Sequence, residues 1–303
     1  MADPDSREVD VNPGFFGHAR SNGGDWILVF LLMIVVALLQ LAPPFERYVS
    51  KEAVDELRYP LKDNTIPTLV VPIFAILIPV LVIFLLVRFG HKDSTDLHHA
   101  VLGLFASVLL TAVITDIVKL YVGRLRPDFY WRCFPPGTEE RFKPDGNVWC
   151  TGSARVIKEG RKSFPSGHAS WTSAGMSYLA LYLAGRLHVF NGNGGLWRLV
   201  VVLFPMLVTA VMCISRVSDY WHHWQDVTVG GLLGLFIAMA VYHQHYPSLT
   251  CVLLDNVPQK SFGKIVSLGP DLEAGRDHSS HSAAEAVSDS TLPTEVEHGN
   301  LKK

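Results

Sequence analysis

The chain has 303 residues, of which 49% are hydrophobic and only 18% charged, and its formal net charge is −2 at pH 7. Soluble domains carry roughly 25% charged residues, and this apolar composition excludes a chain disordered throughout, a collagen repeat and a small disulfide scaffold. The near-neutral charge provides no basic field, so nucleic acid is not expected as a partner.

The chain opens with a polar segment over residues 1–24, ahead of the first apolar run. The 25 residues before Trp26 carry five acidic groups and two arginines. They lack the basic stretch and the small-residue cleavage site of a signal peptide. We therefore expect a cytosolic N-terminal segment, followed by a first run that stays in the mature chain as an anchor.

Six uncharged apolar runs of 16 to 23 residues follow one another along the chain. They are Trp26–Ala42, Thr65–Val87, Ala100–Thr115, Ala169–Gly185, Leu199–Ile214 and Val227–Tyr242. Flanking residues extend each to about 20, the length of a membrane-spanning helix, and lipid offers the backbone no polar partner outside a helix. The sequence predicts an all-α, polytopic six-transmembrane-helix bundle over residues 25–247; five spans with a re-entrant segment is the alternative.

The last predicted span carries Gly230 and Gly234, a weak small-residue pattern for close helix packing. Residues 248–303 are rich in Ser, Glu, Asp and Ala. They hold too little apolar surface to order themselves, so we expect a disordered cytosolic tail.

Six spans place both termini on one side and the loops 43–64, 116–168 and 215–226 on the other. Cytoplasmic loops normally carry the excess of Lys and Arg. Here the side of the termini has 11 such residues and the opposite side 15, of which ten lie in 119–162. Either the orientation is reversed or these cations are held there for a function.

Candidate anion-binding residues lie at span ends on that cation-rich side. Lys119 and Arg126 are seven residues, or two helical turns, apart at the end of the third span. Ser166 can cap the fourth helix and Gly167 lets the backbone approach a ligand, at a helix N-terminus that favours an anion. Arg216 ends the fifth span. Three cations suit a doubly charged tetrahedral anion, which arginine binds bidentately.

Two histidines complete the set. His222 and Asp226 are four residues apart, so a helix would stack them and the carboxylate would fix the imidazole tautomer. His168 follows Gly167. One imidazole can attack phosphorus while the other protonates the leaving oxygen, which gives phosphoryl transfer through a covalent intermediate with no metal or other cofactor.

At these residues the chain resembles the type 2 phosphatidate phosphatase superfamily. Its signatures KxxxxxxRP, PSGH and SRxxxxxHxxxD read here KLYVGRLRP, PSGH and SRVSDYWHHWQD, in order and at the same spacing. The surrounding sequence is most similar to plant or fungal lipid phosphate phosphatases. The resemblance implies hydrolysis of lipid phosphate monoesters such as phosphatidic acid, and also of diacylglycerol pyrophosphate and lysophosphatidic acid, without Mg²⁺.

The resemblance also implies a role for each matching residue. Lys119, Arg126 and Arg216 would bind the substrate phosphate with Ser166 and the Gly167 amide. His222 would be the nucleophile that forms a phosphohistidine, oriented by Asp226, and His168 the general acid.

The family places the catalytic loops on the lumenal or extracellular side, with the termini cytosolic, in the endoplasmic reticulum or plasma membrane. Phosphate binding would then account for part of the cation excess. In an oxidising compartment Cys133 and Cys150, 17 positions apart in one loop, can form a disulfide.

Alternatives remain at several positions. Asp219 competes with Asp226 as the partner of His222, although the i to i+4 spacing favours Asp226. His223 is expected to be structural. A zinc site would be opposed by the three cations, and a hydrolase using Ser166 as nucleophile leaves them unexplained. A transporter with an anion site would place charges within the spans, where the six runs have none.

Overall fold

The computed structural model describes residues 14–90, 94–190 and 195–249, which all belong to one compact unit, Met1–Pro258. Within these ranges the regular structure is helical, apart from one isolated β-bridge between Phe142 and Val148. The predicted all-α class is therefore confirmed. The predicted tail lies outside the described residues from position 250 onward.

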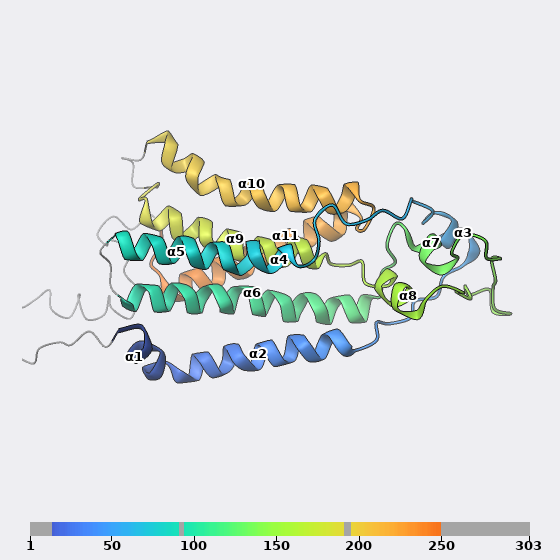
Figure 1. Ribbon diagram of the computed structural model, residues 1–303, viewed down its shortest axis with the longest axis horizontal. Coiled ribbons are helices and arrows are strands. Elements are labelled where there is room, and N and C mark those ends of the chain that lie inside the picture. Colours follow the sequence, from blue (N-terminus) through green and yellow to red (C-terminus); the bar gives the residue numbers. More distant parts are fainter. Residues whose placement is uncertain (1–13, 91–93, 191–194, 250–303) are drawn as a thin grey trace, which may run out of the picture. The chain divides into compact units, whose positions relative to one another are not determined.

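Long helices lie side by side as a bundle (Figure 1). They are α2 (Gly23–Leu41), α4 (Val70–Pro72) continued by the π-helical η1 (Ile73–Leu77) and α5 (Ile78–Phe89), α6 (Ser94–Val122), α9 (Gly167–Arg186), α10 (Leu196–Ser218) and α11 (Trp224–His245). Five of these spans, all except α9, are long and apolar enough to cross a membrane. The short helices are α1 (Gly14–Ser21), α3 (Lys51–Asp55), α7 (Phe129–Cys133) and α8 (Ala154–Gly160).

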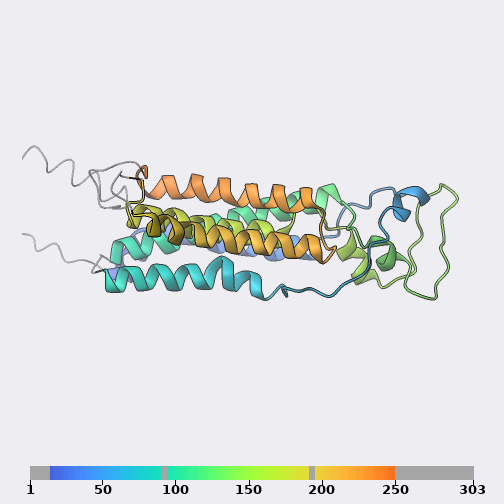
Figure 2. The same cartoon turned by 90° about the horizontal axis from the view of Figure 1, so that it is seen from above.

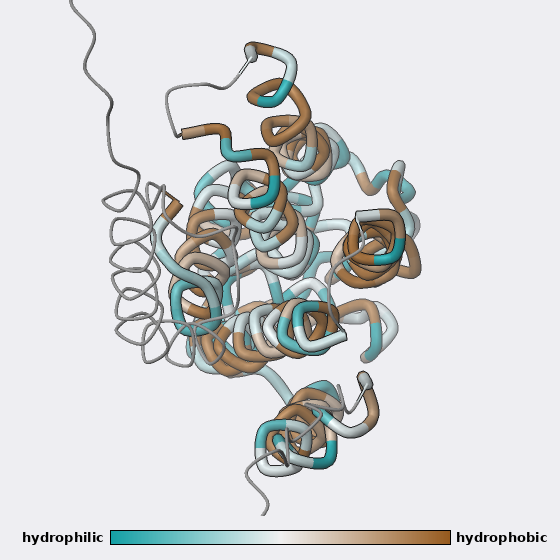
Figure 3. The backbone as a smooth tube through the Cα atoms, turned by 90° about the vertical axis from the view of Figure 1, so that its left-hand side faces the viewer, coloured by the Kyte–Doolittle hydropathy of each residue, from teal (hydrophilic) through white to brown (hydrophobic). Residues whose placement is uncertain are grey.

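Helix α9, which matches the fourth predicted span, has the length of the others but a more polar surface rich in Ser, Gly and Tyr. It packs against α11, α10, α6 and η1, and most of its side chains are buried. A helix enclosed by other helices contacts protein rather than lipid, so small and hydroxyl side chains serve it better than Leu or Ile. Viewed along the bundle, the outlying helices are the most hydrophobic and a paler tube lies between them (Figure 3).

The predicted close packing of the last span is confirmed at the contact between α11 and α9. A Cβ atom added to Gly230 would lie 2.7 Å from the carbonyl oxygen of Ser166, and one added to Gly234 would collide with the backbone of Ser170. The absence of side chains therefore lets α11 lie directly against the first turns of α9.

The loops at one end of the bundle fold into a cap, defined here as residues 43–66 and 123–166, which carries α3, α7 and α8 (Figures 1 and 2). It has its own apolar core, which includes Val49, Phe129 and Phe134. The predicted disulfide between Cys133 and Cys150 is present there, with Cα atoms 4.4 Å apart.

Both described chain ends lie at the opposite end of the bundle. His18 of α1 contacts Thr95 at the start of α6, with 2.8 Å between its Nε2 and Thr95 Oγ1. Tyr246, just after α11, donates its hydroxyl to Asp96 Oδ1 at 3.0 Å. The end of α6, the start of α9 and the α10–α11 connection therefore meet at the cap, on one side, as the parity of six spans requires.

Candidate active site

The end of α6 and the start of α9 bring a lysine onto a helix N-terminus. Ser166 is the N-cap of α9 and its Oγ accepts from the backbone N–H of Ala169 at 3.4 Å, which confirms the predicted cap. A Cβ atom on Gly167 would lie 3.2 Å from Lys119 Nζ. The ammonium group therefore sits directly beside the bare backbone of Gly167, where α9 presents its unpaired N–H groups.

Arg126 enters the site from the cap and is nearly fully buried. Its Nη2 donates to Glu159 Oε1 at 2.6 Å, and its Nε donates to the Glu159 carbonyl at 2.9 Å. Its guanidinium also lies 4.6 Å from the ring centre of Trp221, and the guanidinium of Arg132 lies 4.7 Å from the same ring centre. These contacts hold the guanidinium beside His222, which follows Trp221 in the chain.

Burial raises the pKa of the Glu159 carboxyl, but Arg126 and Lys119 lower it more, and the net pKa lies below its ordinary value. Glu159 is thus ionised at neutral pH and partly neutralises the cations beside it. Its side chain is 46% exposed, so the ion pair with Arg126 is partly open to solvent.

Arg216 is completely buried at the end of α10. Its Nη2 donates to Asp219 Oδ2 at 2.9 Å and its Nη1 donates to Asn64 Oδ1 at 2.6 Å. Asp219 is therefore the ion-pair partner of Arg216, which answers the alternative that it would pair with His222.

His222 is buried, and its Nδ1 lies 2.7 Å from the backbone carbonyl oxygen of Ser163. A carbonyl only accepts hydrogen bonds, so Nδ1 carries the proton and Nε2 keeps the lone pair. Asp226 Oδ2 is 3.7 Å from the same Nδ1. The carbonyl of Ser163 is therefore the direct hydrogen-bond acceptor, and the Asp226 carboxylate lies behind it.

Asp226 holds together the segments around His222. Its carboxylate accepts from Ser163 Oγ at 2.6 Å, from Arg124 Nη1 at 2.6 Å and from the backbone N–H of His223 at 3.0 Å. Its own backbone carbonyl accepts from the N–H of Ser166 at 3.0 Å. The carboxylate also lies 3.3 Å from Nδ1 of His223. Its bond with the His223 N–H, together with the bond from the Asp226 N–H to the His223 side chain, forms a capping box at the start of α11.

Burial lowers the pKa of His222 to about 3; Asp226 acts in the opposite direction, and Arg126 and Lys119 lower it further. The imidazole is therefore neutral at physiological pH. A neutral imidazole with a free Nε2 lone pair is the form that can act as a nucleophile.

His168 lies in the first turn of α9. The charges of Arg216, Lys119 and Arg126 lie close enough to act on its ring. The backbone of Ile66 lies beside its ring, and its Nε2 is buried without a hydrogen-bond partner among the described residues. A buried ring nitrogen with no partner is costly, so we interpret Nε2 as directed at a substrate atom.

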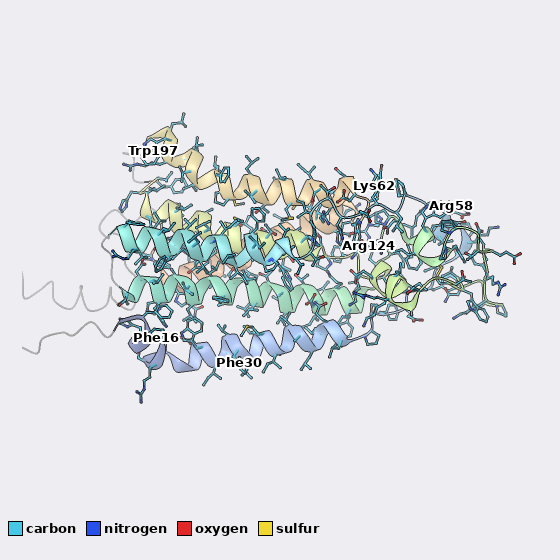
Figure 4. The ribbon with its side chains drawn as sticks, viewed as in Figure 1. Phe16, Phe30, Arg58, Lys62, Arg124 and Trp197 are labelled. Atoms are coloured by element: carbon cyan, nitrogen blue, oxygen red, sulfur yellow. A yellow bond between two sulfur atoms is a disulfide. The ribbon has the colours of Figure 1, made fainter. Side chains whose placement is uncertain are left out.

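The structure thus gathers the predicted residues, from helices far apart in the sequence, at the junction of bundle and cap. Four participants were not predicted: Ser163, Arg124, Glu159 and Asn64. Arg124 and Ser163 lie within three residues of predicted positions, yet nothing in the sequence pattern distinguishes them. Figure 4 shows Arg124 at this junction together with Lys62 of the cap.

Comparison with known proteins gives consistent results. The PAP2 superfamily profile matches residues 100–249. Lipid phosphate phosphatase 2 of Arabidopsis thaliana is 49% identical over 229 residues, which cover 76% of this chain and 79% of the relative. A probable diacylglycerol pyrophosphate phosphatase 1 of Schizosaccharomyces pombe is 34% identical, covering 77% and 84%. Diacylglycerol pyrophosphate phosphatase 1 of Saccharomyces cerevisiae is 30% identical, covering 75% and 82%. No solved structure matches the chain.

Proposed function

The chain belongs to the PAP2 superfamily of multi-pass membrane proteins, and from this membership we propose that it is a lipid phosphate phosphatase. It would hydrolyse phosphatidic acid to diacylglycerol and phosphate, and also act on diacylglycerol pyrophosphate and lysophosphatidic acid, without Mg²⁺. One observation carries the proposal: the carbonyl of Ser163, 2.7 Å from Nδ1, orients the His222 imidazole, which burial keeps neutral beside the cations that also act on His168.

In the proposed reaction, Lys119, Arg126 and Arg216 hold the phosphate against the N-terminus of α9. Nε2 of His222 attacks phosphorus and a phosphohistidine bond forms as the bond from phosphorus to the lipid oxygen breaks. His168, protonated on both ring nitrogens while the phosphate is bound, gives the proton on Nε2 to that oxygen, and the lipid alcohol leaves. The now neutral His168 takes a proton from a water that attacks the phosphohistidine, which releases phosphate and restores neutral His222 and protonated His168.

Cations are needed at each step, because negative charge on the transferring phosphoryl oxygens must be balanced in a site of low dielectric. Arg216 has five N–H groups, of which three are engaged by Asn64, Asp219 and Ser215. One N–H remains on each of Nη1 and Nη2, which suits a bidentate contact with phosphate.

We infer that the cap faces the lumen or the cell exterior, with the termini in the cytosol. The disulfide between Cys133 and Cys150 supports this orientation, because disulfides persist in oxidising compartments. Two ion pairs also account for part of the cation excess: Arg132 forms a buried pair with Asp128, and the partly exposed Arg124 pairs with the buried Asp226. Either the endoplasmic reticulum or the plasma membrane fits this arrangement.

The proposed function is tested by phosphate release from phosphatidic acid in mixed micelles containing EDTA. We expect turnover by the purified protein, and loss of turnover in both His222→Ala and His168→Ala. Denaturation of wild-type protein during turnover should trap labelled phosphate on the protein, and His222→Ala should trap none. Unchanged hydrolysis by His222→Ala would rule out the assignment.

A further inference from the structure

We propose that the segment Lys62–Ile66, between the first two spans, is a fourth element of the active site, in which Asn64 and Thr65 are positioning residues for Arg216. None of the three sequence signatures includes this segment. The inference rests on the proposed function for the identity of the bound anion. Its basis is that residues of the segment contact the end of α10, the α10–α11 connection and the start of α9. Figure 4 labels Lys62 of this segment near Arg124.

The first contact is with the residue before the nucleophile. Trp221 Nε1 donates to the backbone carbonyl of Lys62 at 2.8 Å. The ammonium group of Lys62 lies 4.9 Å from the ring centre of Tyr220, which itself stacks on Tyr59 at 5.1 Å. The segment is therefore attached directly to the connection between α10 and α11, where His222 lies.

The second contact is with the buried Arg216. Asn64 Oδ1 accepts from Nη1 of Arg216 at 2.6 Å. Thr65 donates to Asp219 twice, from its backbone N–H at 2.9 Å and from its Oγ1 at 2.6 Å. Because Asp219 accepts from the other terminal nitrogen of Arg216, Asn64 and Thr65 together fix both ends of the guanidinium fork.

The choice of an amide at position 64 has an electrostatic consequence. An amide oxygen accepts from Arg216 and leaves its charge intact, whereas a second carboxylate would neutralise it. Asp219 already supplies one negative charge. Asn64 therefore orients the guanidinium and leaves it available for phosphate.

The third contact is with the proposed general acid. The backbone of Ile66 lies beside the His168 ring, whose Nε2 is buried without a hydrogen-bond partner among the described residues. The segment therefore also reaches the first turn of α9, where His168 lies. Pro67 follows Ile66 and disfavours a helical backbone at that position.

The position of the segment argues against a purely structural role. Thr65 is exposed and Asn64 is only half-buried, so neither belongs to an apolar core. Their inward contacts are all with charged or hydrogen-bonding groups of the site.

The test uses the full-length protein and orthovanadate, a tetrahedral phosphate analogue, as the probe. Asn64→Asp keeps an acceptor for Arg216, so we expect unchanged thermal unfolding. It should nevertheless weaken vanadate inhibition about tenfold and raise KM, because it reduces the positive charge that faces the anion. Asn64→Ala should lower kcat/KM by roughly tenfold through loss of a charge-assisted hydrogen bond.

Thr65 has a matched set of variants. Thr65→Val removes the Oγ1 donor and should weaken vanadate inhibition and lower kcat, whereas Thr65→Ser should restore both. Thr138→Val is the control, since Thr138 Oγ1 donates to the Pro135 carbonyl at 2.7 Å elsewhere in the cap. It should change neither quantity.

The outcomes separate the two proposals. If wild-type protein neither hydrolyses lipid phosphates nor responds to vanadate, the proposed function fails. If wild-type protein is active, and the folded variants Asn64→Asp and Thr65→Val have the same inhibition constant for vanadate and the same kcat as wild type, the role of the segment is refuted. Should Thr65→Val not fold, the comparison of Asn64→Asp with wild type decides alone.

Discussion

Replacement of Arg124 by Gln tests how the site orients its nucleophile. Arg124 donates to the carboxylate of Asp226 at 2.6 Å, and this carboxylate is completely buried. Ser163 Oγ and the backbone N–H of His223 also donate to it. The variant therefore removes one charge-assisted hydrogen bond and leaves two donors in place.

The magnitude follows from these contacts. Stripping a buried charge of its only partner costs about 3–5 kcal/mol, whereas a hydrogen bond to a charged group contributes about 1.5–3 kcal/mol. The side chain of Arg124 is 32% exposed, so solvent screening reduces the loss to about 1–2 kcal/mol. If that loss is expressed in the alignment of His222, kcat/KM falls about tenfold, since 1.4 kcal/mol is a factor of ten in rate.

The assay is phosphate release from phosphatidic acid in mixed micelles, with thermal unfolding measured in parallel. Most of the loss should lie in kcat, because Arg124 is not among the residues proposed to bind phosphate. Arg58→Gln is the matched control: its ion pairs with Asp55 and Glu140 lie on the cap surface, with Arg58 44% exposed, and should contribute little. A folded Arg124→Gln variant with kcat/KM within about twofold of wild type would refute the reasoning.

Three further predictions follow from other contacts. Serine at both Cys133 and Cys150 should lower the free energy of unfolding by about 3 kcal/mol, and a reductant should remove the difference from wild type in chemical denaturation. Gly230→Ala should lower both activity and thermal stability, because its Cβ would meet the backbone of α9 at 2.7 Å. Gly231→Ala is the control and should behave as wild type, because the nearest contact of its Cβ is at 4.0 Å. Equal unfolding temperatures for the two variants would contradict the close packing of α11 on α9. The pKa of His222 is lowered from 6.5 in the unfolded chain to about 3 in the folded protein. Between these pH values the unfolded chain binds a proton that the folded protein does not. The free energy of unfolding should therefore fall as the pH drops below about 6.5, by up to about 1.4 kcal/mol per pH unit. His222→Asn should lose less stability than wild type between pH 7 and pH 5, and parallel losses would show that this imidazole is not the cause.

The sequence alone determined the parts of this protein that depend on local pattern. Six uncharged runs of membrane-spanning length predict the helices, since a backbone in lipid has no other way to satisfy its polar groups. The three signatures predict the residues that the structure brings together, because their spacing places each at a span end. Gly230 and Gly234 indicated close packing in the same way.

Other features depend on the tertiary structure, because they involve residues remote in the chain or backbone groups with no sequence pattern. The carbonyl of Ser163 contacts His222 across 59 positions, and every residue type has a carbonyl. Asn64 meets Arg216 across 152 positions, from a loop with no recognisable motif. The low hydropathy of α9 is likewise explained only by the folded bundle, because there the helix contacts other helices instead of lipid. The local sequence therefore determined which side chains lie at the ends of the spans. The packing of the cap on the bundle determined which groups orient those side chains.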